Sequence, residues 1–140
     1  MSVFVENTTG RLADLTGILA AEGIDIKAAT IADTVDFGIL RCIVDEPEKA
    51  TAVLKAKGFT ASITEVLAVE MADHPGGFAA ILEVLAKEQI GVDYIYSTVR
   101  SKEETAAIVM KVEEPEKAVE QLQKHDVKLY TMEELLALGK

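Results

Sequence analysis

The apolar positions of the chain switch between the spacing of strands and the spacing of helices. Residues 2–6 alternate apolar and polar side chains, which predicts a strand. Apolar residues over 12–19 then recur at helical spacing, which predicts an amphipathic helix. Residues 23–32 and 37–44 are again strand-like and are joined by a short polar stretch, which predicts a hairpin.

A second helix and a last strand complete this first pattern. Pro47 suits the first turn of a helix, where its missing N–H leaves no hydrogen bond unmade. Residues 58–66 then have the composition of a strand. The predicted order is therefore βαββαβ, which the crossover rules turn into a four-stranded antiparallel sheet with both helices on one face.

The chain contains this pattern twice. The string EPEKA occurs at 46–50 and again at 114–118, a shift of 68 positions. Nearer the start of each copy the shift is 66 positions, because Gly10 then falls on Gly76. The difference of two residues lies between these blocks, so we expect a longer hairpin turn in the second copy. Such a period indicates duplication of a domain of about 65–70 residues.

The second copy predicts the same elements as the first. Its expected strands span 66–71, 90–99, 106–112 and 127–131, with one helix over 78–85 and another opened by Pro115. The predicted fold class is α+β, with two ferredoxin-like βαββαβ domains over 1–66 and 67–140, each an antiparallel sheet with helices on one face.

The end of the second domain carries a helix signal of its own. Thr131 and Glu134 have the spacing of a capping box, which marks the start of a helix. We expect a short added helix that docks on the domain through Leu135, Leu136 and Leu138.

Alternation in the third strand of each copy separates a core face from an open face. Phe4, Ile39 and Ile43 fall on the face without helices. An apolar face is usually covered, so we expect a second sheet, from the other half or from another chain, to lie on it. Cys42 then is a buried core residue and not a nucleophile. The expected core residues of these strands are Leu40, Cys42, Val44, Ile108, Met110 and Val112.

Composition narrows the function classes. The net charge of −10 argues against binding to a phosphate backbone, which favours clustered Lys and Arg. No apolar run approaches the roughly 20 residues of a membrane helix, and the start of the sequence lacks the pattern of a signal peptide. The single cysteine excludes an internal disulfide and a cage of several cysteines. These observations favour a cytoplasmic protein.

Two loops carry the candidate chemistry, because each joins the first strand of a copy to its first helix. They read ENTTGRL at 6–12 and ADHPGGF at 72–78. Asp73 and His74 are adjacent, and adjacent side chains tend to point apart, which suits a catalytic relay poorly. His74 and His125 lie about 50 residues apart, which is not the spacing of a metal site. The glycines lack the Lys–Ser/Thr pair of a phosphate loop.

A binding loop for a small zwitterion fits these residues better. The first turn of a helix has unpaired N–H groups and a partial positive charge, which attract a carboxylate. Glycine lets a ligand approach the backbone, and Pro75 presets the entry to the helix. Asn7 and Asp73 offer oxygens that can accept from an ammonium group. The alternative, which these residues alone favour, is structural, since Asn and Asp also cap helices and glycine makes turns with no ligand present.

Two βαββαβ units with N-x-x-G-x-L and D-H-P-G-G-F loops resemble the ACT domain family, and the resemblance covers essentially the whole chain as a tandem pair. ACT domains are small regulatory modules, many of which bind amino acids at domain–domain interfaces. The first copy departs from the family's proline–glycine pair, so the resemblance implies loops that differ in affinity or in occupancy. The ligand contacts that it implies are Asn7, Thr8, Thr9, Gly10, Arg11, Leu12, Asp73, His74, Pro75, Gly76, Gly77 and Phe78.

The second strand of a partner domain commonly completes the pocket in this family. Tyr94 and Tyr96 share one face of their strand. Their parity matches Ile90 and Val92, which favours core packing, and the alternative is an aromatic wall for the ligand side chain. The first copy has Thr30 there, which leaves more room.

The leading hypothesis is a non-catalytic amino-acid sensor without a cofactor or metal. It would form a homodimer through sheet edges or faces and signal to a metabolic enzyme that activates an amino acid or an acyl group. One alternative is a small acylphosphatase-like enzyme, which would use Arg11 and His74. Another is an RNA-binding module, which needs basic and aromatic residues on the open face, where Phe4 is the one aromatic residue that the pattern places. A purely structural module without a ligand is the third.

Overall fold

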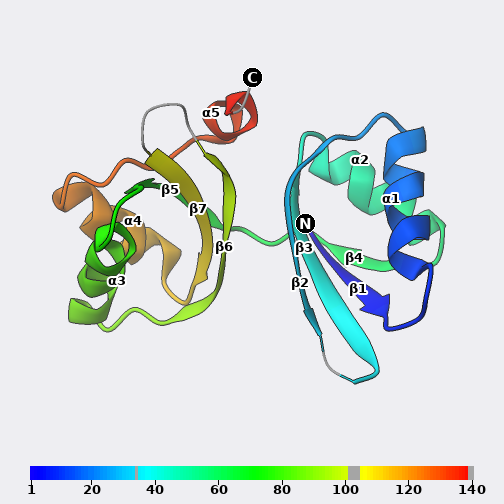
Figure 1. Ribbon diagram of the computed structural model, residues 1–140, viewed down its shortest axis with the longest axis horizontal. Coiled ribbons are helices and arrows are strands. Elements are labelled where there is room, and N and C mark those ends of the chain that lie inside the picture. The colour runs from blue at the N-terminus through cyan, green and yellow to red at the C-terminus, as the bar shows by residue number, and fades with distance from the viewer. Residues whose placement is uncertain (34, 101–104, 139–140) are drawn as a thin grey trace. The chain divides into compact units, whose positions relative to one another are not determined.

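The structure, a computed structural model, describes residues 1–33, 35–100 and 105–138. The chain divides into two compact units, Met1–Thr64 and Glu65–Lys140. Each unit has one antiparallel sheet, and Figure 1 shows the two long helices of each unit on one side of its sheet. This is the α+β arrangement of two ferredoxin-like domains that the sequence predicted.

The first unit has all six predicted elements. Its sheet has the strand order β2-β3-β1-β4, with every neighbouring pair antiparallel. The elements are β1 (Ser2–Glu6), α1 (Arg11–Ala21), β2 (Ile26–Asp33), β3 (Phe37–Val44), α2 (Pro47–Ala56) and β4 (Thr60–Ser62).

The second unit repeats this order up to its last strand, which is missing. The prediction of a strand over 127–131 is wrong, because this stretch forms a single bridge between Leu129 and Val69. Thr131 then starts a further helix, so the chain turns away before a ladder can extend. The elements are β5 (Leu67–Ala72), α3 (Gly77–Lys87), β6 (Val92–Arg100), β7 (Thr105–Val112), α4 (Pro115–Lys124) and α5 (Met132–Ala137), with the strand order β5-β7-β6.

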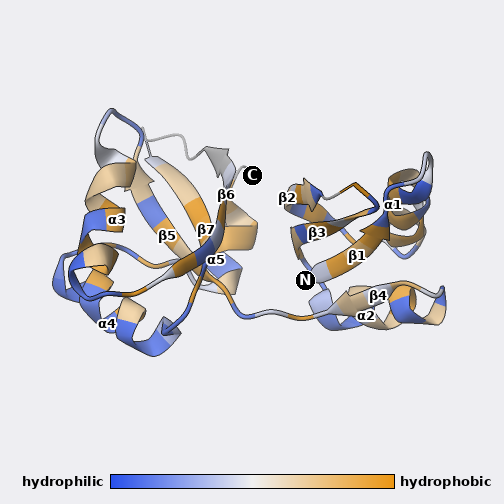
Figure 2. Cartoon of the chain, turned by 90° about the horizontal axis from the view of Figure 1, so that it is seen from below, coloured by the Kyte–Doolittle hydropathy of each residue, from blue (hydrophilic) through white to orange (hydrophobic). Residues whose placement is uncertain are grey.

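The predicted core faces are confirmed in both units. Leu40, Cys42 and Val44 pack with α1 and α2 in one core cluster, and the equivalent residues of β7 pack with α3 and α4 in another. Leu15 and Leu54 are fully buried in the first cluster, and each such side chain stabilises the fold by about 1.5–3 kcal/mol. In Figure 2 the strands of both sheets are largely hydrophobic, whereas the helices mix hydrophobic and hydrophilic residues, as amphipathic helices do.

The open face of the first sheet carries the predicted apolar residues. Phe4 pairs with Ile39 across β1 and β3, and both lie outside the core cluster. Phe4 is 42% exposed and stacks on Phe37, with the two ring centroids 4.4 Å apart.

A β-bulge reverses the alternation of side chains in the second strand of each copy. The register shifts between Ile26 and Ala28 in β2 and between Val92 and Tyr94 in β6. Beyond the bulge, Tyr96 pairs with Val109, whereas the core residue Met110 pairs with Ile95. The expectation that Tyr94 and Tyr96 pack in the core is therefore wrong, because the bulge moves both to the open face.

The longer turn predicted for the second copy is confirmed by the strand registers. Ile31 pairs with Leu40 in the first hairpin, and Ser97 pairs with Ile108 in the second. The segment between the paired residues is therefore two residues longer in the second copy, with Thr34 and residues 101–104 outside the described part.

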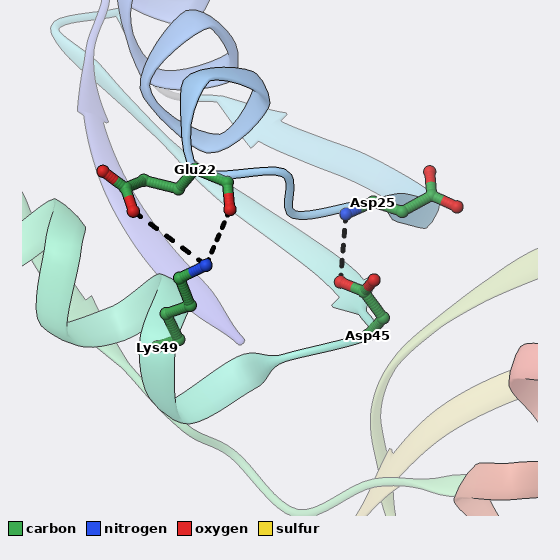
Figure 3. Close-up of polar contacts among 4 residues, drawn as sticks. All are labelled: Glu22, Asp25, Asp45 and Lys49. Carbon is green, nitrogen blue, oxygen red and sulfur yellow. Dashed lines mark hydrogen bonds and ion pairs between the residues drawn. The ribbon is translucent and has the colours of Figure 1, made fainter.

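The repeated EPEKA string ties the start of one helix to the end of the helix before it. In each copy its proline begins the helix, and its alanine, Ala50 or Ala118, is fully buried. Lys49 Nζ donates a hydrogen bond of 2.7 Å to the carbonyl oxygen of Glu22, the residue that ends α1 (Figure 3). In the second copy Lys117 Nζ donates to the Glu88 carbonyl oxygen at 3.0 Å. The string therefore repeats because it makes the same structural contact twice.

The added C-terminal helix forms as predicted. Thr131 and Glu134 make both hydrogen bonds of a capping box, and Leu135 is buried. No helix in the described part of the chain is long and apolar enough to cross a membrane.

Candidate functional site

The two candidate loops form corners with the same backbone. We call residues 7–12 the first corner and residues 73–78 the second corner. Gly10 precedes α1 with φ 91° and ψ −15°, and Gly76 precedes α3 with φ 92° and ψ −15°. These values lie in the left-handed region, which glycine adopts without strain. The N-cap of each helix is a glycine, which has no side chain to cap the helix, and the Asn7 side chain donates to the Val35 carbonyl oxygen.

The corners leave backbone amides without helical partners. In α1, Asp14 N donates the first bond of the helical pattern, to the Gly10 carbonyl oxygen at 2.9 Å. The amides of Leu12 and Ala13 precede that bond, and no described side chain caps them. The second corner is built in the same way, with Ala80 N donating to the Gly76 carbonyl oxygen at 3.0 Å. The first corner therefore offers two N–H groups at the positive end of a helix, and the second corner has the same backbone.

A small hollow of about 160 Å³ lies at the first corner, and we call it the first corner hollow. Asn7 anchors the loop beside this hollow. Its Nδ2 donates to the Val35 carbonyl oxygen at 3.1 Å, and its backbone N donates to the Asp36 carbonyl oxygen at 3.0 Å. The Oδ1 atom of Asn7 is thereby left as the acceptor of this side chain. The hollow is lined by Val5, Glu6, Asn7, Thr8, Leu12, Ile31, Asp33 and Gly38.

A larger hollow of about 350 Å³ lies at the second corner, and we call it the second corner hollow. His74, Gly76 and Gly77 of the predicted residues line it, whereas Asp73 and Pro75 are exposed outside the lining. Phe78, also outside the lining, packs on the core of its unit. The remaining lining residues are Glu70, Met71, Ala72, Ala80, Ile81, Thr105, Asp126, Val127 and Lys128.

Several lining residues were missed by the sequence reasoning. Ile31 and Asp33 lie on β2, and Asp126 lies in the turn after α4, so the fold brings them to the corners from far along the chain. Ile31 stands out only in the structure, where this apolar residue of an edge strand is 47% exposed on the side of the helices.

Arg11 does not line the first corner hollow. Its guanidinium carbon lies 4.0 Å from the centroid of the Phe59 ring, and the side chain lines a separate groove along α1. The Nε atom of Arg11 is buried and has no hydrogen-bond partner in the described residues. Thr9 and Gly10 are exposed and line none of these hollows.

Three further predicted residues lie on the open faces of the sheets. Thr30 pairs with Arg41 on the open face of the first sheet, and the rings of Tyr94 and Tyr96 stack with centroids 6.4 Å apart on the second. None of the three lines a corner hollow of its own unit. With Phe37, these tyrosines add to the open faces aromatic residues that the sequence pattern did not place there.

The walls of each corner hollow include two acidic residues. Glu6 and Asp33 line the first, and Glu70 and Asp126 line the second together with Lys128. Tyr130 Oη donates to Glu70 Oε2 at 2.7 Å. Burial, aided by this carboxylate, raises the pKa of Tyr130 to about 12, because ionisation would leave two negative charges in contact. The first hollow combines two carboxylates with Leu12, whose N–H precedes the first helical bond, and these groups can complement the ammonium and the carboxylate of one small zwitterion.

The histidines and the cysteine are occupied by structural contacts. His74 Nδ1 donates to the Pro75 carbonyl oxygen, and His125 Nδ1 donates to the Gln121 carbonyl oxygen, both at 2.9 Å. Burial raises the pKa of the Cys42 thiol, which disfavours the reactive thiolate. Within the ranges that the structure describes, no three metal-ligating side chains form a cluster.

Comparisons with known proteins identify the family of the chain. A family model described as an ACT domain pair matches residues 1–138. Protein BT0572 from Bacteroides thetaiotaomicron is 36% identical, has a TM-score of 0.91, and aligns over 98% of this chain and 94% of its own.

More distant structures share the fold. The ligand-free regulatory subunit of aspartate kinase from Thermus thermophilus is 17% identical, with a TM-score of 0.63 over 88% of this chain and 90% of its own. A structure of the alpha and beta subunits of aspartokinase is 20% identical, with a TM-score of 0.58 over 89% and 86%. No curated protein sequence matches the chain.

Proposed function

Since the chain belongs to the ACT domain pair family, we propose that it is a non-catalytic regulatory module that binds a free α-amino acid at its glycine corners. The observation that carries this proposal is the repeated corner. Gly10 and Gly76 have the same left-handed conformation, and each is the N-cap of the helix that follows, a position where glycine has no side chain to bond the first amides. Two N–H groups at a helix start are suited to hold the carboxylate of an amino acid.

The walls of the corner hollows supply the complementary half of the ligand site. In the first hollow, Asp33, Glu6 and the Oδ1 atom of Asn7 are acceptors for an ammonium group. Leu12 and Ile31 are 42% and 47% exposed, and they give this hollow an apolar side for the ligand side chain. The second hollow has Glu70 and Asp126 in place of these acceptors and is about twice as large. The two sites should therefore differ in affinity and in preferred ligand.

The remaining candidate residues stay in the proposal as contacts made outside the corner hollows. Thr30, Tyr94 and Tyr96 lie on second strands, which this family commonly uses to complete the pocket of a neighbouring domain. Binding there would favour one arrangement of domains over another, which is how a ligand couples to a distant partner. The partner that we propose is a metabolic enzyme that activates an amino acid or an acyl group.

An acylphosphatase-like activity is not favoured by any contact at the corners. Such a site needs a basic group in the loop, and Arg11 instead stacks on Phe59. His74 is engaged with the Pro75 carbonyl oxygen.

Calorimetric titration with each of the twenty amino acids tests the proposal. We expect at least one to bind, and we expect Asp33→Asn or Asp126→Asn to weaken binding at its own corner by about tenfold, since an ammonium partner is lost. Glu48→Gln removes an exposed acid on α2 and is the matched control, which should bind as the unchanged protein does. Absence of heat with all twenty, from protein shown to be folded, would contradict the proposal.

A further inference from the structure

We propose that the groove between α1 and α2 binds a small monocarboxylate, with its apolar tail between the helices and its carboxylate at one end. The two helices pack side by side on one face of the first sheet (Figure 1), and the groove between them has a volume of about 650 Å³. No residue of this groove lines a corner hollow. The proposal therefore does not rest on amino-acid binding at the corners.

The two helices run in opposite directions, so the groove has two different ends. At one end Arg11, the first residue of α1, lies over the ring of Phe59, which follows α2. Lys57 also lines this end, and we call it the basic end. At the far end Lys49 Nζ donates to the carbonyl oxygen of Glu22, which ends α1 (Figure 3). That contact joins the two helices and closes the groove there.

The cations of the basic end have no partners of their own. Neither Arg11 nor Lys57 makes a side-chain hydrogen bond or an ion pair within the described residues. The chain has 24 acidic and 14 basic residues, so a shortage of acids does not explain an unpaired arginine. Stacking on Phe59, at 4.0 Å from the ring centroid, holds the plane of the Arg11 guanidinium. A guanidinium held in place can donate two parallel hydrogen bonds to a carboxylate at little cost in entropy.

The middle of the groove is apolar. Ile18 from α1 and Val53 from α2 both line it, and both are partly buried. Ile18 also packs on the core cluster of the first unit, so the floor of the groove continues into that core. Ile18 lies seven residues after Arg11, which is about 10 Å along the helix. A medium-chain acyl tail whose carboxylate meets Arg11 therefore reaches Ile18 and is removed from water there.

Acidic residues in the lining restrict the charge of the ligand. Asp14 is exposed and lies three residues after Arg11, so it repels an anion at the basic end. Glu22 places a second negative charge at the far end, where its Oε2 lies 3.9 Å from Lys49 Nζ. A phosphate dianion would be repelled more strongly by Asp14, and a dicarboxylate would place its second charge near Glu22. One carboxylate on an apolar tail fits this arrangement better than either.

The second copy has the same helices without this site. Gly77 and His125 stand at the positions of Arg11 and Lys57, so the fixed positive charges are lost. The hollow that His125 lines beside α3 is about 300 Å³, less than half as large. Since both copies have helices of 11 and 10 residues, the fold does not require the cations. The second unit is therefore an internal control for binding.

Nuclear magnetic resonance of the isotope-labelled full chain, titrated with octanoate, tests the proposal. We expect a dissociation constant of about 0.1–1 mM and shifts of backbone amides in α1 and α2, without comparable shifts in α3 and α4. Octylamine has the same tail with the opposite charge, and acetate has the same charge without the tail. Each should bind at least about tenfold more weakly than octanoate, because the groove uses both parts of the ligand.

Variants of the lining separate the charges. Arg11→Met should raise the dissociation constant for octanoate at least about tenfold, and Lys57→Met should raise it about threefold. Asp14→Asn should lower it about threefold, since a repulsive charge is removed. Lys55→Met removes an exposed charge of α2 outside the groove and is the matched control, which should bind octanoate as the unchanged protein does. Circular dichroism checks that each variant is folded.

Three outcomes would overturn the proposal. The first is the absence of any amide shift in α1 or α2 at millimolar octanoate. The second is that octylamine binds as octanoate does, or that Arg11→Met leaves the affinity unchanged, because the tail alone would then make an unspecific contact. The third is a set of equal shifts in the helices of both units, because the second unit lacks the cations. Tighter binding by Asp14→Asn together with weaker binding by Arg11→Met would support the orientation that we assign to the ligand.

Discussion

The two corners of this protein have one backbone and two sets of side chains, and they differ most at the residue after the left-handed glycine. In the first corner that residue is Arg11, whose side chain leaves the loop and stacks on Phe59. In the second it is Gly77, which is buried, and a Cβ atom there would lie 2.1 Å from the carbonyl oxygen of Ala72. Gly10 or Gly76 thus sets the backbone conformation of its corner. How closely the loop packs against the preceding strand depends instead on the residue after that glycine.

The next residue along each helix also packs differently in the two copies. Leu12 is 42% exposed and lines the first corner hollow, whereas Phe78 packs on the core of the second unit. A duplicated domain can therefore keep its fold and its left-handed glycine corners while one copy changes what surrounds them. The family resemblance identifies the shared backbone, and the local packing decides how each site differs.

The largest expected effect on stability comes from replacing glycines at the corners, where glycine either allows a close approach to the backbone or adopts the left-handed conformation. Gly77→Ala should lower the free energy of unfolding by about 3 kcal/mol, because the new methyl group overlaps a backbone oxygen and the backbone must move. Gly10→Ala should cost about 1 kcal/mol, since a Cβ there meets nothing within 4 Å and only the left-handed conformation is strained. Urea unfolding followed by circular dichroism measures both. Equal losses of the free energy of unfolding would show that the loop of the second corner packs no more closely against its preceding strand than the loop of the first.

A smaller effect is expected where the two copies agree, at the lysine of each EPEKA string. Lys49→Met and Lys117→Met should each cost about 1 kcal/mol, the loss of one partly exposed, charged hydrogen bond to the end of the preceding helix. Lys55→Met, on the exposed side of α2, is the control and should be close to neutral. A loss in one copy only, measured by the same unfolding experiment, would mean that the repeated string has diverged in role.

The smallest expected effect is a loss of stability at high pH, and it arises only in the second copy. Ser62 stands in the first copy where Tyr130 stands in the second, so only the second copy has a phenol against a carboxylate. The pKa of Tyr130 is raised from 10.0 to about 12 in the folded state. The folded protein therefore keeps this proton longer than the unfolded chain does. The stability that this contact contributes is complete below pH 10 and is lost as the pH rises from 10 to about 12.

Ultraviolet titration of the folded protein measures this ionisation. One of the three tyrosines should ionise with a midpoint near pH 12, and this step should disappear in Tyr130→Phe. Between pH 10 and 12, the free energy of unfolding of the same variant should also fall less than that of the unchanged protein. A complete tyrosine titration below pH 11 would contradict the burial and the contact with Glu70 that the structure shows at this position.

Local patterns in the sequence were sufficient to predict much of this protein. The repeated EPEKA string and the matched glycines revealed two copies, and helical and strand spacing gave the order of the elements. Alternation placed Leu40, Cys42 and Val44 in the core, and the spacing of Thr131 and Glu134 gave the last helix. These features depend on residues close together in the chain, so they can be predicted from the sequence alone.

Tertiary structure decided the features that depend on residues far apart. A bulge of one residue turned Tyr94 and Tyr96 from the core to the open face, and alternation cannot reveal such an insertion. The last stretch of the second copy formed one bridge where the first copy formed a strand, because α5 begins too soon after it. Asp33 and Asp126 reached the corners, and Arg11 left its own, because packing brings together side chains from separate elements. The sequence by itself determined which backbone recurs, and only the folded chain determined which side chains surround it.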